Sequence, residues 1–230
     1  MATYSQIFAS TNSGFCGGRE ELSSILIMET KRIKIMQTDA IVIGEKAENV
    51  ILFVHGQGGN KEEAIRFAEI AIPLGYQVIG IDLNVMDMPW NVLPRLWEVK
   101  RFLKENYNSI SLRANSIGCW LSLLAFENEQ IDKSLFVSPI PDMKTFIECL
   151  EQKDMKYYEW VVEHQVEHWQ NKTYILRPKN DLVVSDRVYE AFINKFACDV
   201  TTIEDGEHWF HTPEQLHRLG EWEYSVLTEI

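Results

Sequence analysis

The sequence has few cysteines, and they are widely separated. Four occur in 230 residues, and no two form a CxxC pair. They are Cys16, Cys119, Cys149 and Cys198. A chain of this length buries enough apolar surface to fold without a disulfide framework, so we expect reduced thiols and a cytoplasmic location. The N-terminus also lacks a basic segment followed by a long apolar core, and we therefore expect no secretory signal.

Long hydrophobic runs and an excess of basic residues are missing as well. No stretch approaches the roughly 20 apolar residues that span a bilayer, so we expect no membrane span. Lysine and arginine number 22 against 34 aspartate and glutamate residues, which gives a net charge of −12. Because phosphate binding requires a basic surface, this balance argues against nucleic acid as a main partner. No feature of the sequence sets the oligomeric state.

The remaining composition is that of a globular protein, with 46% hydrophobic and 24% charged residues. The length predicts one domain. We place it over residues 31–230, after an N-terminal arm over residues 1–30 to which we assign no function. The arm carries the loop-like segments 11–14 and 17–18.

Apolar runs alternate with helical patterns along this domain. We predict strands at 32–36, 40–43, 49–54, 77–82, 109–113, 133–137, 173–176 and 199–203, and helices at 61–72, 93–107, 119–126, 185–195 and 213–227. The alternation predicts an α/β fold, a three-layer αβα sandwich with a mostly parallel central sheet and right-handed crossovers. Residues 37–39 are predicted to turn between the first two strands. Residues 141–170 contain helical patterns and no strand, and we predict that they form a short helical cap over a pocket.

One serine stands on a predicted tight turn from strand to helix, Ala114-Asn115-Ser116-Ile117-Gly118. Such a turn exposes the serine hydroxyl at the carboxyl end of the strand. It accepts only small residues two positions before and after the serine, because the backbones of strand and helix nearly touch there. The alternative is a solvent-facing serine in an ordinary loop.

Two further polar residues follow later strands. Asp181 comes after the strand at 173–176, and His208 comes after the strand at 199–203. Because the carboxyl ends of parallel strands meet at one edge of a sheet, we expect both side chains at the same edge as Ser116. Serine, acid and histidine then occur in an order typical of one hydrolase fold.

Four stretches together make the sequence resemble the α/β-hydrolase superfamily. They are His55-Gly56-Gln57-Gly58-Gly59, residues 114–118, residues 179–184 and residues 205–210. The resemblance covers about residues 32–229. Most members of the superfamily have glycine at the position of Ala114, so this sequence differs from them there by one methyl group. The resemblance implies the α/β-hydrolase fold with a short cap insertion and a serine esterase, lipase or thioesterase-like activity.

The same resemblance implies a role for each site residue. Ser116 is the implied nucleophile, and His208 is the base that takes its proton. Asp181 is the acid that holds the imidazole and stabilises its charged form. The backbone N–H groups of Gln57 and Ile117 are the implied oxyanion-hole donors.

The glycine-rich loop itself is implied to support this hole. We expect His55 to shape the loop through hydrogen bonds, and Gly56 and Gly58 to let its backbone approach the substrate. We expect the reaction to need neither a metal nor an organic cofactor.

Several alternatives remain open for the acid and the base. His211 is a rival base, and the rival acids are Asp82, Glu204 and Asp205. Asp181 could instead cap the helix that follows it.

The predicted cap carries two patterns of its own. Residues 164–168 fit H-x-x-E-H, a zinc pattern that requires both histidines on one helix face, although no third ligand is evident. The aromatic residues Tyr157, Tyr158, Trp160 and Trp169 either line a pocket or pack the cap.

The sequence as a whole predicts a serine hydrolase. The expected substrate is a small-to-medium carboxylic ester or thioester, cleaved through an acyl-enzyme. The alternative is a non-catalytic protein of the same fold that binds a small ligand or partner.

Overall fold

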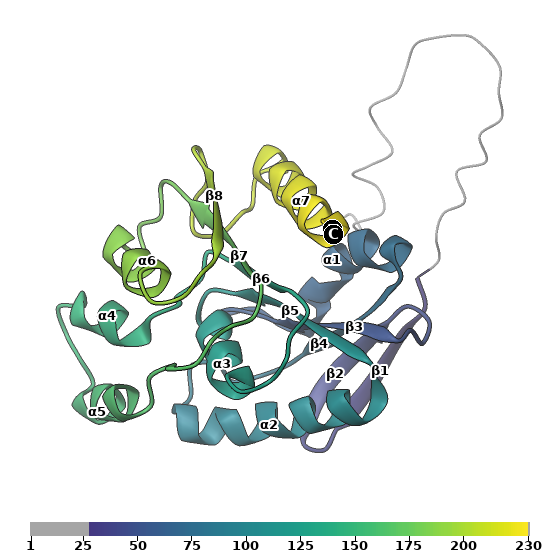
Figure 1. Ribbon diagram of the computed structural model, residues 1–230, viewed down its shortest axis with the longest axis horizontal. Coiled ribbons are helices and arrows are strands. Elements are labelled where there is room, and N and C mark those ends of the chain that lie inside the picture. The colour runs from purple at the N-terminus through teal and green to yellow at the C-terminus, as the bar shows by residue number, and fades with distance from the viewer. Residues whose placement is uncertain (1–27, 230) are drawn as a thin grey trace, which may run out of the picture.

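The computed structural model describes residues 28–229. The predicted arm over residues 1–30, and Cys16 within it, therefore lie almost wholly outside the described residues. One sheet in the order β1-β2-β4-β3-β5-β6-β7-β8 runs through the centre of the described part (Figure 1). Its strands are β1 Thr30–Ile35, β2 Thr38–Ile43, β3 Asn49–Val54, β4 Tyr76–Ile81, β5 Ser109–Asn115, β6 Ser134–Val137, β7 Thr173–Pro178 and β8 Asp199–Ile203.

The sheet is mostly parallel. Strands β1 and β2 form an antiparallel hairpin at one edge, β2 pairs antiparallel with β4, and the pairs from β4 to β8 are parallel. Parallel strands need a crossover between them, and helices supply it here. They are α1 Ala64–Ala71, α2 Pro89–Asn106, α3 Ile117–Phe126, α4 Met143–Glu148, α5 Met155–Glu163, α6 Asp186–Ile193 and α7 Pro213–Thr228.

Each face of the sheet has its own apolar core. Helices α1 and α7 cover one face, and α2, α3 and α6 cover the other together with α4 and α5 (Figure 1). Strand residues such as Val50, Leu52 and Ile79 are fully buried, because both faces of the central strands are covered. The predicted three-layer αβα sandwich is therefore confirmed. Within residues 28–229, no helix is long and apolar enough to cross a bilayer.

Several predicted boundaries differ from those observed. The first hairpin turns at residues 36–37 and not at 37–39, since Thr38 already pairs with Ile35 and Met36 takes the positive φ of 53° that a two-residue turn requires. Helix α2 begins at Pro89, four residues before its predicted start, because proline is favoured at the first helical position. Pro94 lies inside this helix, exposed to solvent.

The segment predicted as one helix at 61–72 is also divided. A 3₁₀ turn over Lys61–Glu63 precedes α1, and a second over Ile72–Leu74 follows it. The first turn begins at a capping box on Asn60. The second contains Pro73 and ends at Gly75, whose φ of 89° terminates the helix.

The excursion at 141–170 forms the short helices α4 and α5, and it packs through both aliphatic and aromatic side chains. The rings of Tyr157 and Trp160 each lie 6.2 Å from the ring of Trp120 on α3. Trp169 lies 6.3 Å from Phe136 on β6. These residues therefore join the excursion to the main core.

A buried ion pair connects β5 to α7. The Arg113 guanidinium lies 2.7 Å from Oε1 of Glu223, and the two side chains are 3% and 0% exposed. Arg66 on α1 lies 3.3 Å from the other oxygen of Glu223. Because Arg113 also donates to the side chain of Asn115, this network reaches the residue before Ser116.

Candidate active site

Ser116 occupies a strained turn between β5 and α3. Its φ of 49° and ψ of −123° are unusual for a residue with a side chain, and such strain persists only where neighbours hold it. Its N–H donates to the oxygen of Val137 at 3.1 Å, and its own carbonyl accepts from the N–H of Ile140 at 3.1 Å. The end of β6 and the loop after it therefore hold the turn from both sides.

Small residues around Ser116 allow this close approach. A Cβ atom on Gly118 would overlap the backbone oxygen of His55, and one on Gly56 would lie 3.1 Å from the Cβ of Ser116. Ala114 is fully buried, so the turn accommodates its additional methyl group. The glycine-rich loop and the serine turn are therefore in direct contact.

A chain of hydrogen bonds links Ser116, His208 and Asp181. The Oγ atom of Ser116 lies 3.0 Å from Nε2 of His208. The Nδ1 atom of His208 lies 2.9 Å and 3.1 Å from the two carboxylate oxygens of Asp181. Because a carboxylate only accepts hydrogen bonds, Nδ1 carries the proton and Nε2 is free to accept from the serine hydroxyl. The structure thus brings together three residues from three separate loops.

The Asp181 carboxylate is buried and remains charged. Burial raises its pKa, but hydrogen bonds from His208 and from the N–H groups of Val184 and Val183 outweigh that effect and hold the pKa below its usual value. The two N–H groups donate to Oδ1 at 2.9 Å and 2.8 Å. Asp181 therefore stabilises its own turn, while Ser185 occupies the N-cap of α6.

The loops that carry Asp181 and His208 are joined by their backbones. The N–H of Lys179 donates to the oxygen of Ile203, and the N–H of Asn180 donates to the oxygen of Gly206, both at 2.9 Å. These bonds continue the pairing of β7 with β8 beyond the ends of the strands. Asp181 and His208 are consequently held in one unit.

Gln215 is a buried residue that sequence reasoning missed. Its side-chain N–H donates to the oxygen of Asp205 at 2.9 Å, and its Oε1 accepts from the N–H of His211 at 3.2 Å. It therefore bridges the loop that carries His208. The capping box from Thr212 to Gln215 was a usable signal in the sequence.

The rival residues lie elsewhere or have other partners. His211 is exposed, with Nδ1 2.8 Å from the oxygen of Trp209. Asp205 pairs with Arg218 at 2.5 Å. Glu204 is exposed to solvent.

Asp82, the remaining rival acid, pairs with Lys61. It accepts hydrogen bonds from both the side chain and the backbone N–H of that residue. Burial raises the pKa of Asp82, and these bonds more than reverse the effect, so its pKa lies below the usual value. The ion pair anchors the 3₁₀ turn before α1 to the end of β4.

His55 holds the glycine-rich loop through two hydrogen bonds, which also fix the tautomer of its imidazole ring. Its Nε2 accepts the N–H of Leu83 at 3.1 Å, so the ring proton is on Nδ1, which donates to the oxygen of Gly56 at 2.7 Å. The ring is 3% exposed. Gly58 follows with a φ of 74° that favours glycine.

The two N–H groups predicted as oxyanion donors belong to Ile117 and Gln57, which directly follow the two residues in contact, Ser116 and Gly56. Ile117 is the first residue of α3, and Gln57 is exposed directly after Gly56. Neither N–H donates a hydrogen bond within residues 28–229.

The zinc interpretation of residues 164–168 is wrong in its premise. Helix α5 ends at Glu163, and His168 lies in non-helical chain, so the two histidines do not share a helix face. The His164 ring stacks on Trp160 with centroids 4.0 Å apart. Glu127 accepts hydrogen bonds from the backbone of Glu167 and His168, in a segment with no regular secondary structure.

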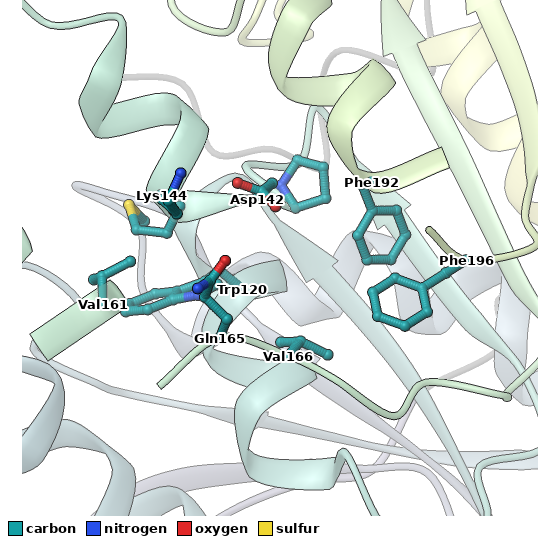
Figure 2. A pocket seen from close by; sticks show the side chains of 10 residues that line it. Trp120, Asp142, Lys144, Val161, Gln165, Val166, Phe192 and Phe196 are labelled. Atoms are coloured by element: carbon teal, nitrogen blue, oxygen red, sulfur yellow. The ribbon is translucent and has the colours of Figure 1, made fainter. Parts of the chain in front are cut away.

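Two hollows adjoin the excursion. Figure 2 shows a narrow crevice between Trp120, Phe192 and the excursion, with a cavity volume of about 20 Å³, enough for about one water molecule. An open groove of about 330 Å³ lies between α2 and α5, where Trp90 and Trp160 form part of its wall. The other three aromatic residues of the predicted set, Tyr157, Tyr158 and Trp169, line neither hollow.

Solved structures share the fold of this chain although their sequences differ. The sequence matches no protein-family model, and no curated protein is similar to it. Est1E from Butyrivibrio proteoclasticus superposes with a TM-score of 0.71 at 15% identity, over 86% of this chain and 97% of that one. An alpha-beta serine hydrolase homologue from Coxiella burnetii gives a TM-score of 0.61 at 17% identity, over 87% and 97%.

A third solved structure agrees with these two. Esterase EaEST from Exiguobacterium antarcticum gives a TM-score of 0.61 at 14% identity, over 84% of this chain and 96% of that one. The chain therefore has the α/β-hydrolase fold, as its sequence predicts.

Proposed function

We propose that this α/β-hydrolase-fold protein is a serine hydrolase that cleaves a small-to-medium carboxylic ester or thioester through an acyl-enzyme. The observation that carries the proposal is the continuous set of hydrogen bonds from Ser116 through His208 to Asp181. A serine hydroxyl is a weak nucleophile, and a base within hydrogen-bonding reach is what activates it.

Acylation follows from this geometry. The Oγ atom of Ser116 attacks the carbonyl carbon of the substrate while Nε2 of His208 takes the hydroxyl proton. The carbonyl oxygen becomes an oxyanion, which the N–H groups of Gln57 and Ile117 stabilise. When the carbon–oxygen or carbon–sulfur bond breaks, His208 returns the proton to the departing alcohol or thiol. The acyl group is then esterified to Ser116.

Deacylation repeats these steps with water. Nε2 of His208 takes a proton from the water, whose oxygen attacks the acyl carbon. The second oxyanion collapses, the bond to Oγ breaks, and His208 returns the proton to Ser116. The negative charge of Asp181 stabilises the imidazolium form of His208 in both halves of the reaction.

A ligand bound to one structure of similar fold supports a compact substrate. Est1E, one of the similar structures, has been solved with ferulic acid bound. That acid is a compact carboxylic acid, and its esters belong to the size class that we propose here.

The proposal is tested by labelling with a fluorophosphonate probe and locating the adduct by mass spectrometry. We expect an adduct on Ser116 and turnover of p-nitrophenyl acetate or butyrate. Ser116→Ala should lose both, whereas Ser225→Ala, an exposed serine on α7, should keep both. A folded wild-type protein with neither adduct nor turnover would overturn the proposal and favour the non-catalytic alternative.

A further inference from the structure

A buried tyrosine contacts the carboxylate of Asp181 from the side opposite its backbone partners. Tyr189 on α6 is 1% exposed, and its hydroxyl lies 3.3 Å from Oδ2 of Asp181. The same oxygen lies 2.9 Å from Nδ1 of His208. Oδ1 is already bonded to two backbone N–H groups, so the tyrosine contacts the oxygen nearer to the imidazole.

We propose that Tyr189 is a positioning residue for the acid of this site. Its hydroxyl donates to Oδ2 and holds the carboxylate in the rotation that directs Oδ2 at His208. The proposal rests on the proposed function, since a positioning role has meaning only where His208 acts as a base. Tyr189 itself acts through Asp181 and takes no part in the transfer of the acyl group.

The charges around Tyr189 favour this direction of the hydrogen bond. Burial, with the nearby negative charge of Asp181, raises the pKa of the Tyr189 phenol, so the hydroxyl keeps its proton. The guanidinium of Arg177 lies 5.0 Å from the ring and pairs with Asp186. Burial also raises the pKa of the Cys119 thiol, which therefore stays neutral. An ionised Asp181 can only accept.

Loss of the hydroxyl has a specific consequence. Oδ2 would keep a single partner, the imidazole, and the rotation of the carboxylate about its Cβ–Cγ bond would then be fixed only by that bond and the bonds to Oδ1. His208 would then be less well oriented for each proton transfer, which lowers kcat and leaves KM unchanged because no substrate contact is lost. The 3.3 Å separation is long for an O–H···O bond, although such bonds often tighten when substrate binds.

The test compares Tyr189→Phe with Tyr174→Phe. Tyr174 is 3% exposed, so it is buried to a similar extent, but it lies in the core on the other face of the sheet. For Tyr189→Phe we expect a fall in kcat of about 3- to 10-fold, as for one hydrogen bond of ordinary net strength, with KM within about twofold. For Tyr174→Phe we expect no change in kcat.

The pH profile separates positioning from packing. Without the phenol, the Asp181 carboxylate interacts more strongly with the charged imidazolium, so the acid limb of kcat/KM should move to higher pH in Tyr189→Phe alone. Equal losses in both variants, or an unchanged acid limb in Tyr189→Phe, would overturn the proposal.

A readout independent of turnover distinguishes this proposal from the proposed function. The Nδ1 proton of His208 gives a downfield NMR signal when it bonds to a carboxylate, whether or not the protein hydrolyses esters. We expect this signal to move in Tyr189→Phe and to stay in place in Tyr174→Phe. If the signal moves in Tyr189→Phe but fluorophosphonate does not label the protein, the contact between Tyr189 and Asp181 is supported and the proposed hydrolase activity is rejected. An unmoved signal would reject the contact itself.

Discussion

The Nε2 atom of His55 accepts a hydrogen bond from the backbone N–H of Leu83, 28 residues further along the chain. This bond ties the end of β3 to the loop after β4. It also fixes which nitrogen of the imidazole carries the proton, and therefore the direction of the second bond, from Nδ1 to the oxygen of Gly56. The glycine-rich loop is thus held by a buried imidazole whose two ring nitrogens are both hydrogen-bonded.

His55→Ala should therefore weaken the oxyanion site without removing a donor. The Gly56–Gln57 peptide would lose its support, and we expect kcat to fall by about 10- to 100-fold, less than the 10²–10³-fold typical of a deleted donor. Steady-state kinetics with p-nitrophenyl acetate would measure the change. His217→Ala is the matched control, since His217 is exposed on α7. Wild-type kcat in His55→Ala would contradict this role.

Gln215→Met should loosen the loop that carries His208. The substitution keeps the volume of the side chain but leaves the oxygen of Asp205 and the N–H of His211 without their partner, at a cost of about 1–3 kcal/mol. We expect faster hydrogen exchange in residues 205–212 and a lower kcat. Gln130→Met, at an exposed position, should change neither. Unaltered exchange in that loop would show that other contacts hold it.

The buried pair of Arg113 and Glu223 predicts a double-mutant result. Glu223→Leu alone leaves the Arg113 guanidinium buried and unpaired, so the free energy of unfolding should fall by about 3–5 kcal/mol. Combining it with Arg113→Met removes that charge and should recover most of the loss. Urea denaturation of both variants would measure the coupling. Additive losses would contradict it.

The lowered pKa of Asp181 predicts how stability depends on pH. Its folded pKa lies below the unfolded value of about 3.9, so the ionised group stabilises the fold above that pH. This contribution is lost as the pH falls through the folded pKa. The difference in unfolding free energy between wild type and Asp181→Asn should therefore be constant from neutral pH to about pH 5 and shrink below about pH 4. A constant difference down to pH 2 would contradict the shift.

Residues under local constraints were predictable from the sequence. Ser116 needs small neighbours within two positions, Asp181 follows an apolar strand and His208 follows the last strand, so their spacing and order carry the information. The same holds for the sheet, because a buried parallel strand must be apolar throughout. These features depend on residues close together in the chain.

Features that depend on distant contacts were not predictable. The helical pattern at 164–168 does not produce a helix there. The carboxylate of Glu127, about 40 residues away in the sequence, accepts hydrogen bonds from the backbone of that segment instead. Helix α2 retains Pro94 because Val92 and Leu96 pack into the core beside it. Tyr189 shows no signal in the sequence, since a tyrosine on the buried face of a helix is ordinary packing until the position of Asp181 is known.

The excursion leaves the sheet after β6 and returns at β7, and these two strands pair directly with each other. Asp181 and His208 lie beyond that return point, in loops bonded to one another, while Ser116 lies before the departure point. The register of β6 against β7 consequently rests on their own pairing, and residues 141–170 contribute packing against Trp120 and Phe136. Libraries for changing the proposed acyl preference would therefore vary the exposed side chains of that segment and keep its buried ones.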